Sequence, residues 1–139
     1  MDADQDRGSI AIEAAILVPA ILLFLLLVIA AGRAQTAQGA VDAAVRDAAR
    51  SASLMRTEAG AEQAAGDTVA ATLDQEGVNC QDENLDVRYA AGTQGQAGSV
   101  QVTLLCHIPV GDLAVPGLPG TVSRHSSFTS VLDLYRASS

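Results

Sequence analysis

The longest hydrophobic pattern in the sequence is an uninterrupted apolar run near its start. Residues 14–31 read AAILVPAILLFLLLVIAA and contain no charged side chain. Together with the apolar residues 10–12, this run gives a helix of about 30 Å, which is the thickness of a bilayer core. The pattern predicts one transmembrane helix over residues 9–32. Pro19 lies inside it, and we expect a helix kink there, which membrane helices tolerate.

A second pattern, with a period of three to four residues, follows the apolar run. Arg33 closes that run, and small apolar residues then recur on one side of a predicted helix. The members of this stripe are Ala37, Val41, Ala44, Ala48, Ala52 and Met55, with a weaker continuation through Ala61, Ala65, Thr68, Val69, Thr72 and Leu73. Gly77 is a stop signal of the kind that follows a helix. We therefore predict an amphipathic soluble helix over residues 33–77, about 65 Å long if it is unbroken.

The period changes to two after Gly77. The segment LDVRY at residues 85–89 alternates like a strand, and VQVTLLCHI at residues 100–108 is the clearest strand in the chain. Residues 121–135 predict a third strand with weak alternation, and glycine and proline make loops of the segments between the strands. Residues 78–139 thus predict a small antiparallel β-sheet laid on the apolar stripe of the long helix, which is an α+β, pilin-like fold.

Composition and motifs limit the classes of function that the chain can have. The chain has 139 residues, a net charge of −8 and eight basic residues, all of them arginine. Without a basic stripe, nucleic acid is excluded as a partner. The sequence contains no P-loop, no dinucleotide-binding glycine motif and no G-x-S-x-G nucleophile motif. We expect no enzymatic activity and no cofactor. Cys106 and His107 are adjacent, which is poor spacing for a metal site, and we expect no metal.

The two cysteines, Cys80 and Cys106, both follow the apolar run. An even number of cysteines in an exported chain predicts a disulfide, which we favour over free thiols or metal ligands. This bridge would join the end of the soluble helix to the central strand. It would contribute about 3–4 kcal/mol in the chain-entropy model.

The apolar run has a second interpretation as a cleaved secretory signal. Such signals begin with a positive segment, whereas residues 1–8 carry three aspartates and one arginine. The run is also longer than the apolar part of an ordinary signal, so we favour a retained anchor. The leader is polar, and we expect it to be disordered. Arginine alone leaves the orientation undecided, because Arg7 and Arg33 flank the run on opposite sides.

Glu13 is a lone carboxylate in an apolar stretch. A capping box does not explain it, since such a box needs glutamate three residues after the cap and Ile12 holds that place after Ser9. An ionisable side chain in such a stretch is by default a functional hypothesis.

The stretch RGSIAIEAAILVPAILLFLLLVIAAGRAQ resembles the N-terminus of TadE-like proteins, the minor pseudopilins of tight-adherence (Tad, Flp-type) pili, which are related to type IV pili. The family has a short leader ending in glycine, a glutamate five residues later and a membrane helix with an early proline. Gly8, Glu13 and Pro19 occupy those places. VDAAVRDAARSAS at residues 41–53 is similar to the family's alanine- and arginine-rich helix. The tail TVSRHSSFTSVLDLYRASS is similar to endings of actinobacterial members.

This resemblance implies processing by a prepilin peptidase, which would remove residues 1–8 by cutting between Gly8 and Ser9. Glu13 would then be the fifth residue of the mature chain. The implied location is the cell membrane, in a single pass, with the N-terminus cytoplasmic and the C-terminal domain outside, or incorporated in a pilus. The implied partners are the peptidase, other pilin and pseudopilin subunits, inner-membrane assembly proteins and the lipid bilayer.

An alternative function is kept open beside this one. The chain would then be a single-pass anchored or secreted binding domain unrelated to pili. The sheet and the loop at residues 109–120 would form its recognition surface.

Overall fold

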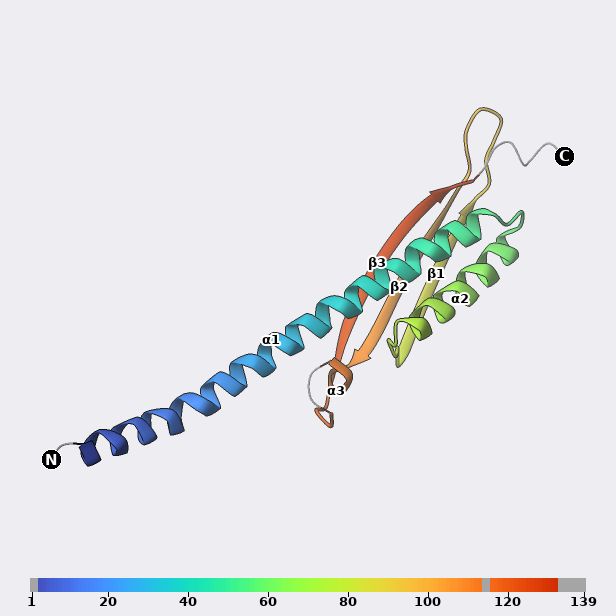
Figure 1. Ribbon diagram of the computed structural model, residues 1–139. Helices are drawn as coiled ribbons and strands as arrows, with labels where there is room; N and C mark the ends of the chain where they lie inside the picture. Colours follow the sequence, from blue (N-terminus) through green and yellow to red (C-terminus); the bar gives the residue numbers. More distant parts are fainter. Residues whose placement is uncertain (1–2, 114–115, 133–139) are drawn as a thin grey trace.

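The computed structural model describes residues 3–113 and 116–132, with the backbone alone for residues 3–11. In chain order the elements are α1 (Ala3–Ser53), α2 (Glu58–Gln75), β1 (Asp82–Ala90), β2 (Ser99–Pro109), α3 (Val110–Leu113) and β3 (Thr121–Val131). The first half of α1 projects as a rod, and its second half lies with α2 against a small sheet (Figure 1). The predicted α+β arrangement is confirmed.

The sheet has the strand order β1-β2-β3, and both strand pairs are antiparallel. β2 is the predicted central strand, and its side chains alternate in burial along its whole length. Val100, Val102, Leu104, Cys106 and Ile108 face the helices and are buried. The three strands expected at residues 85–89, 100–108 and 121–135 are present, although β3 ends at Val131. Residues 133–135 lie outside the described residues.

The core is built from small side chains on the helices and larger ones on β2. The second half of α1 is buried along a stripe of Ala37, Ala40, Val41, Ala44, Val45, Ala48, Ala49 and Ala52. α2 contributes Ala61, Ala65, Val69 and Leu73. Alanine has a short side chain, so it lets the helices approach one another and the sheet closely. The predicted stripe is present but wider than expected, and Met55 is not buried in it.

The soluble helical region is not a single helix over residues 33–77, and that prediction is wrong. α1 ends at Ser53 and α2 begins at Glu58, so that α2 runs back beside α1 (Figure 1). A rod of about 65 Å would extend well beyond strands of 11 residues, which are about 36 Å long. Folding back brings both apolar stripes onto the same sheet, which a straight helix would not achieve.

Local signals mark both ends of α2. Thr57 has an extended backbone, with φ −127° and ψ 150°, and its hydroxyl accepts a hydrogen bond from the Gly60 N–H at 3.1 Å. At the other end Gly77 has a φ of +67°. The Val78 N–H donates to the Leu73 carbonyl at 2.9 Å, which completes a Schellman motif. Gly77 is thus the helix stop that the sequence predicts.

Two smaller expectations are also corrected. Residues 3–8 were expected to be disordered, yet α1 begins at Ala3, since no helix-breaking residue before Gly8 interrupts the backbone ladder. The loop at residues 109–120 contains the one-turn helix α3. Figure 1 shows that α3 lies at the end of the sheet nearest the projecting rod, and the β1–β2 connection lies at the far end.

Candidate membrane anchor and processing site

The projecting half of α1 is apolar on every side. Every large apolar side chain between Ile12 and Ile29 is at least 50% exposed. A helix that is hydrophobic all round belongs in a protein core or in a bilayer, and nothing in the described protein covers this one. By length and composition it is able to cross a membrane, although a signal sequence near an N-terminus has the same properties.

Glu13 lies near the start of this apolar helix, and its side chain is exposed. Gly8 and Ser9 lie in the same helix, one to two turns earlier, and their side chains are outside the described residues. Glu13 precedes Ala37, the first buried side chain on α1, by about 36 Å along the helix axis. The three residues of the expected processing site therefore lie on one helix, far from the sheet.

Pro19 is inside α1, which continues as helix on both sides of it. Its ring removes one backbone N–H donor and leaves the carbonyl of residue 15 without that partner. In water an internal proline costs about 3 kcal/mol, whereas membrane helices tolerate it. The kink itself stays a prediction.

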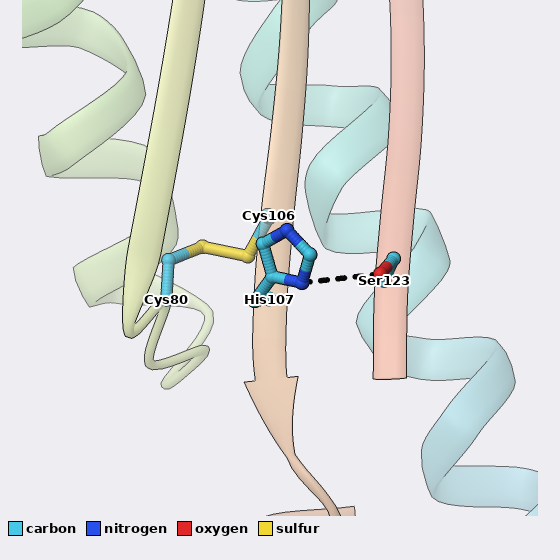
Figure 2. The surroundings of a disulfide bond; sticks show 4 residues. All are labelled: Cys80, Cys106, His107 and Ser123. Carbon is cyan, nitrogen blue, oxygen red and sulfur yellow. Dashed lines mark hydrogen bonds between the residues drawn. A yellow bond between two sulfur atoms is a disulfide. The ribbon is translucent and has the colours of Figure 1, made fainter. Parts of the chain in front are cut away.

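The predicted disulfide between Cys80 and Cys106 is present. The two Cα atoms are 5.3 Å apart, which is within the usual range for a disulfide. Cys106 is fully buried on the helix-facing side of β2, and Cys80 lies between the end of α2 and β1 (Figure 2). The bridge therefore fastens the α2–β1 connection to the central strand.

A polar pair lies beside the disulfide on the opposite face of the sheet. His107 Nδ1 is 3.1 Å from the Ser123 hydroxyl oxygen, and the two residues are direct partners in the β2–β3 register (Figure 2). The contact is exposed to solvent. It is a cross-strand pair that supports the sheet.

The first half of the chain matches a known family. Residues 8–50 match the family model described as TadE-like protein. Over this segment the chain is similar to TadE-like proteins. The matched region begins at Gly8, includes Ser9, Glu13 and Pro19, and ends within the soluble half of α1. The resemblance seen in the sequence is confirmed.

The TadE-like segment does not extend to α2 or to the sheet. Neither the curated proteins nor the solved structures gave a match to this chain. The suggested actinobacterial origin rests on the tail alone and stays a prediction.

Sequence reasoning missed one group of residues near the anchor. From the sequence, Arg33 was considered only as a charge that closes and flanks the apolar run. In the structure it shares a cavity with Glu76, Asn79 and Asp112, which come from distant parts of the sequence. Only the folded chain brings these side chains together, so no sequence pattern predicts that they form a common cavity.

Proposed function

We propose that the chain is a minor pseudopilin-like structural component of a Tad/Flp-type pilus assembly or secretion system, processed by a prepilin peptidase after Gly8. The observation that carries this proposal is the TadE-like match over residues 8–50, which coincides with an exposed apolar helix. The same helix holds the cut site, the anchor and the first part of the soluble core. Because one helix holds all three, we expect the protein to pack through this helix with other pilin and pseudopilin subunits.

The disulfide supports an orientation for the anchored chain. Disulfides persist in oxidising compartments and are rare in the cytosol. Because Cys80 and Cys106 are bridged, the domain formed by α2 and the sheet belongs outside the cytoplasm. The N-terminus then lies on the cytoplasmic side. The prepilin peptidase would meet the leader there, and inner-membrane assembly proteins would meet the anchor in the bilayer.

The helical backbone at the cut site has a consequence for processing. Gly8 and Ser9 lie within α1, so the peptidase must open the first turns to reach the bond between them. Helix ends fray, and glycine is about 1 kcal/mol less favourable than alanine inside a helix. Gly8 therefore makes this opening easier as well as giving the peptidase close access to the backbone.

Cutting after Gly8 would give Glu13 a partner. The new Ser9 α-amine is largely positive at neutral pH. A lone carboxylate deep in a bilayer costs about 3 kcal/mol on insertion scales, and less near the end of a helix. Pairing Glu13 of one subunit with the Ser9 amine of its neighbour would recover part of this cost and fix the axial register between subunits.

Processing can be tested with the full chain co-expressed with a Tad prepilin peptidase. The mass of the wild-type chain should fall by the mass of residues 1–8. Gly8→Val should block the cut, because a branched side chain obstructs close approach to the scissile bond. Gly32→Val is the matched control, since a Cβ at Gly32 meets no atom within 4 Å. It should be processed like the wild type.

Two results would contradict the proposal. A full-length mass in the presence of active peptidase would favour a plain anchor. A mature chain that starts after residue 31 would favour the alternative of a secreted binding domain.

A further inference from the structure

A cavity of about 180 Å³ lies at the end of the domain nearest the anchor. α1, the α2–β1 connection and α3 form its walls. Its floor is apolar, because Ala37, Ile108 and Leu113 are buried there. The rim is polar and carries Arg33, Thr36, Glu76, Asn79 and Asp112. This pattern, an apolar floor with a few convergent polar groups, is typical of small-ligand sites.

The rim carries charges of both signs. Arg33 supplies one cation, and Glu76 and Asp112 supply two carboxylates. Within residues 12–113 and 116–132, the only ion pair closer than 4.0 Å is between Arg88 and Asp86, which is elsewhere in the molecule. Arg33 therefore forms no close ion pair with Glu76 or Asp112. All three charges are available to a ligand that itself carries both signs.

The cavity lies at a defined depth if α1 crosses the membrane. Arg33 follows the apolar run at residues 14–31 after a single glycine. That run, with the apolar residues before it, spans about 30 Å, so Arg33 reaches the headgroup layer as the helix leaves the hydrocarbon. Thr36 and Ala37 are about one turn further along, and α3 is close by at the same end of the domain (Figure 1).

We propose that this cavity binds the headgroup of a zwitterionic phospholipid with a primary ammonium group, as in phosphatidylethanolamine. The proposal rests on the membrane placement in the proposed function. The Arg33 guanidinium donates to the phosphate oxygens, a contact that its planar fork favours. Glu76 and Asp112 accept hydrogen bonds from the ammonium group. The headgroup thus fastens the domain to the membrane surface beside its own anchor.

The rim chemistry also predicts which lipids bind less well. A quaternary ammonium, as in phosphatidylcholine, donates no hydrogen bond and is usually held by aromatic rings. None of the residues named along this cavity is aromatic. Phosphatidylglycerol carries no cation and would bring a negative charge next to two carboxylates. The expected order of binding is ethanolamine first, then choline, then glycerol.

Native mass spectrometry of the full chain tests this order. The disulfide-bonded protein in detergent is mixed with equal amounts of the three lipids, all with the same acyl chains. The wild type should retain the ethanolamine lipid, and Arg33→Gln should reduce that adduct about tenfold, as loss of one charge-assisted contact predicts. Arg50→Gln removes the same charge from an exposed position of α1 outside the cavity and should change nothing.

Two further arms sharpen the test. The double variant Glu76→Gln with Asp112→Asn should lose the preference for ethanolamine over choline while still retaining phospholipid. Free phosphoethanolamine should bind much more weakly than the lipid, because the detergent micelle around the anchor holds the lipid at high local concentration.

Equal retention of the three lipids by the wild type would overturn the proposal, as would an Arg33→Gln variant that binds like Arg50→Gln. Free phosphoethanolamine binding as tightly as the lipid would overturn the lipid assignment. The result of this lipid-binding test does not depend on whether the chain is cut after Gly8. A chain that keeps Met1 but selects the ethanolamine lipid would contradict the pseudopilin proposal and support this one.

Discussion

The two halves of α1 are one continuous helix in two different surroundings. Between Ile12 and Ile29 the side chains are large, apolar and exposed, whereas between Ala37 and Ala52 a stripe of alanine and valine is buried. The first half needs a solvent as apolar as itself, and the second half needs a close-fitting partner. The comparison teaches that the size of the apolar side chains, as well as their spacing, separates a lipid-facing helix from a core helix.

The largest difference in the free energy of unfolding is expected when a leucine side chain is shortened in each half of the molecule. Leu104 on β2 is fully buried, and Leu104→Ala should lower the free energy of unfolding by about 4 kcal/mol through lost burial and a residual cavity. Leu23 is 68% exposed in the anchor, and Leu23→Ala should leave domain stability within about 0.5 kcal/mol of the wild type.

Urea unfolding of the full chain in mild detergent, followed by circular dichroism, measures both variants. If Leu23→Ala were as destabilising as Leu104→Ala, the projecting half of α1 would have to pack against the domain.

Removing the disulfide should lower the free energy of unfolding slightly less, and it should affect only the domain formed with the sheet. Cys80 and Cys106 are 26 residues apart, and a loop of that length is worth about 3.5 kcal/mol in the chain-entropy model. The double variant Cys80→Ser with Cys106→Ser should unfold at correspondingly lower urea, and reductant should shift the wild type but not the variant. Membrane partitioning should stay unchanged in both. A variant that left the membrane fraction would show that the anchor depends on the domain.

The smallest effect concerns the turn that folds α2 back onto α1. The Thr57 hydroxyl accepts the Gly60 N–H, and Thr57→Ala should cost about 1 kcal/mol by removing this cap. Thr36 is the control, because its hydroxyl donates to the Gly32 carbonyl within α1 and caps no helix. Thr36→Ala should stay within about 0.5 kcal/mol of the wild type in the same urea assay. Equal losses would mean that the cap does not hold the turn.

Much of the sheet side could be predicted from the sequence. β2 is buried on one face and paired on both edges, so its alternation is strict and its strand assignment is secure. With only two cysteines there was a single possible intramolecular pair. Gly77 was recognisable because a positive φ after a helix favours glycine.

The break between α1 and α2 was missed for a physical reason. The three-to-four-residue spacing of apolar residues resumes from Ala61 to Leu73, and no proline or glycine stands in residues 54–57 to mark a break. Thr57 lacks a glutamate three residues later, so the usual capping signature is absent, and only Glu58 in the first turn hinted at a helix start.

The weak alternation of β3 also has an explanation in its packing. Arg124, Ser126 and Phe128 point to the helix side, where the polar flank of α1 meets them. The Arg46 guanidinium carbon lies 6.0 Å from the centre of the Phe128 ring, and the Gln38 side chain donates to the His125 carbonyl at 3.5 Å. Because both faces of β3 carry polar residues, hydropathy alone marks it poorly.

The candidate functional residues also fall into a group that the sequence reveals and a group that only the fold reveals. Gly8, Ser9 and Glu13 lie on one helix, so their spacing in the sequence is their spacing in space, and a resemblance was enough to single them out. The cavity around Arg33 assembles residues from three separated segments. Such a site is specified by tertiary packing and becomes visible only in the folded chain.

The mature N-terminus tests the central claim most directly. We predict that the chain isolated from membranes of cells with an active prepilin peptidase begins at Ser9, as read by the mass of its N-terminal peptide. The same peptide from cells without the peptidase should begin upstream of Gly8. A chain from peptidase-containing cells that still carries residues 1–8 would contradict the account.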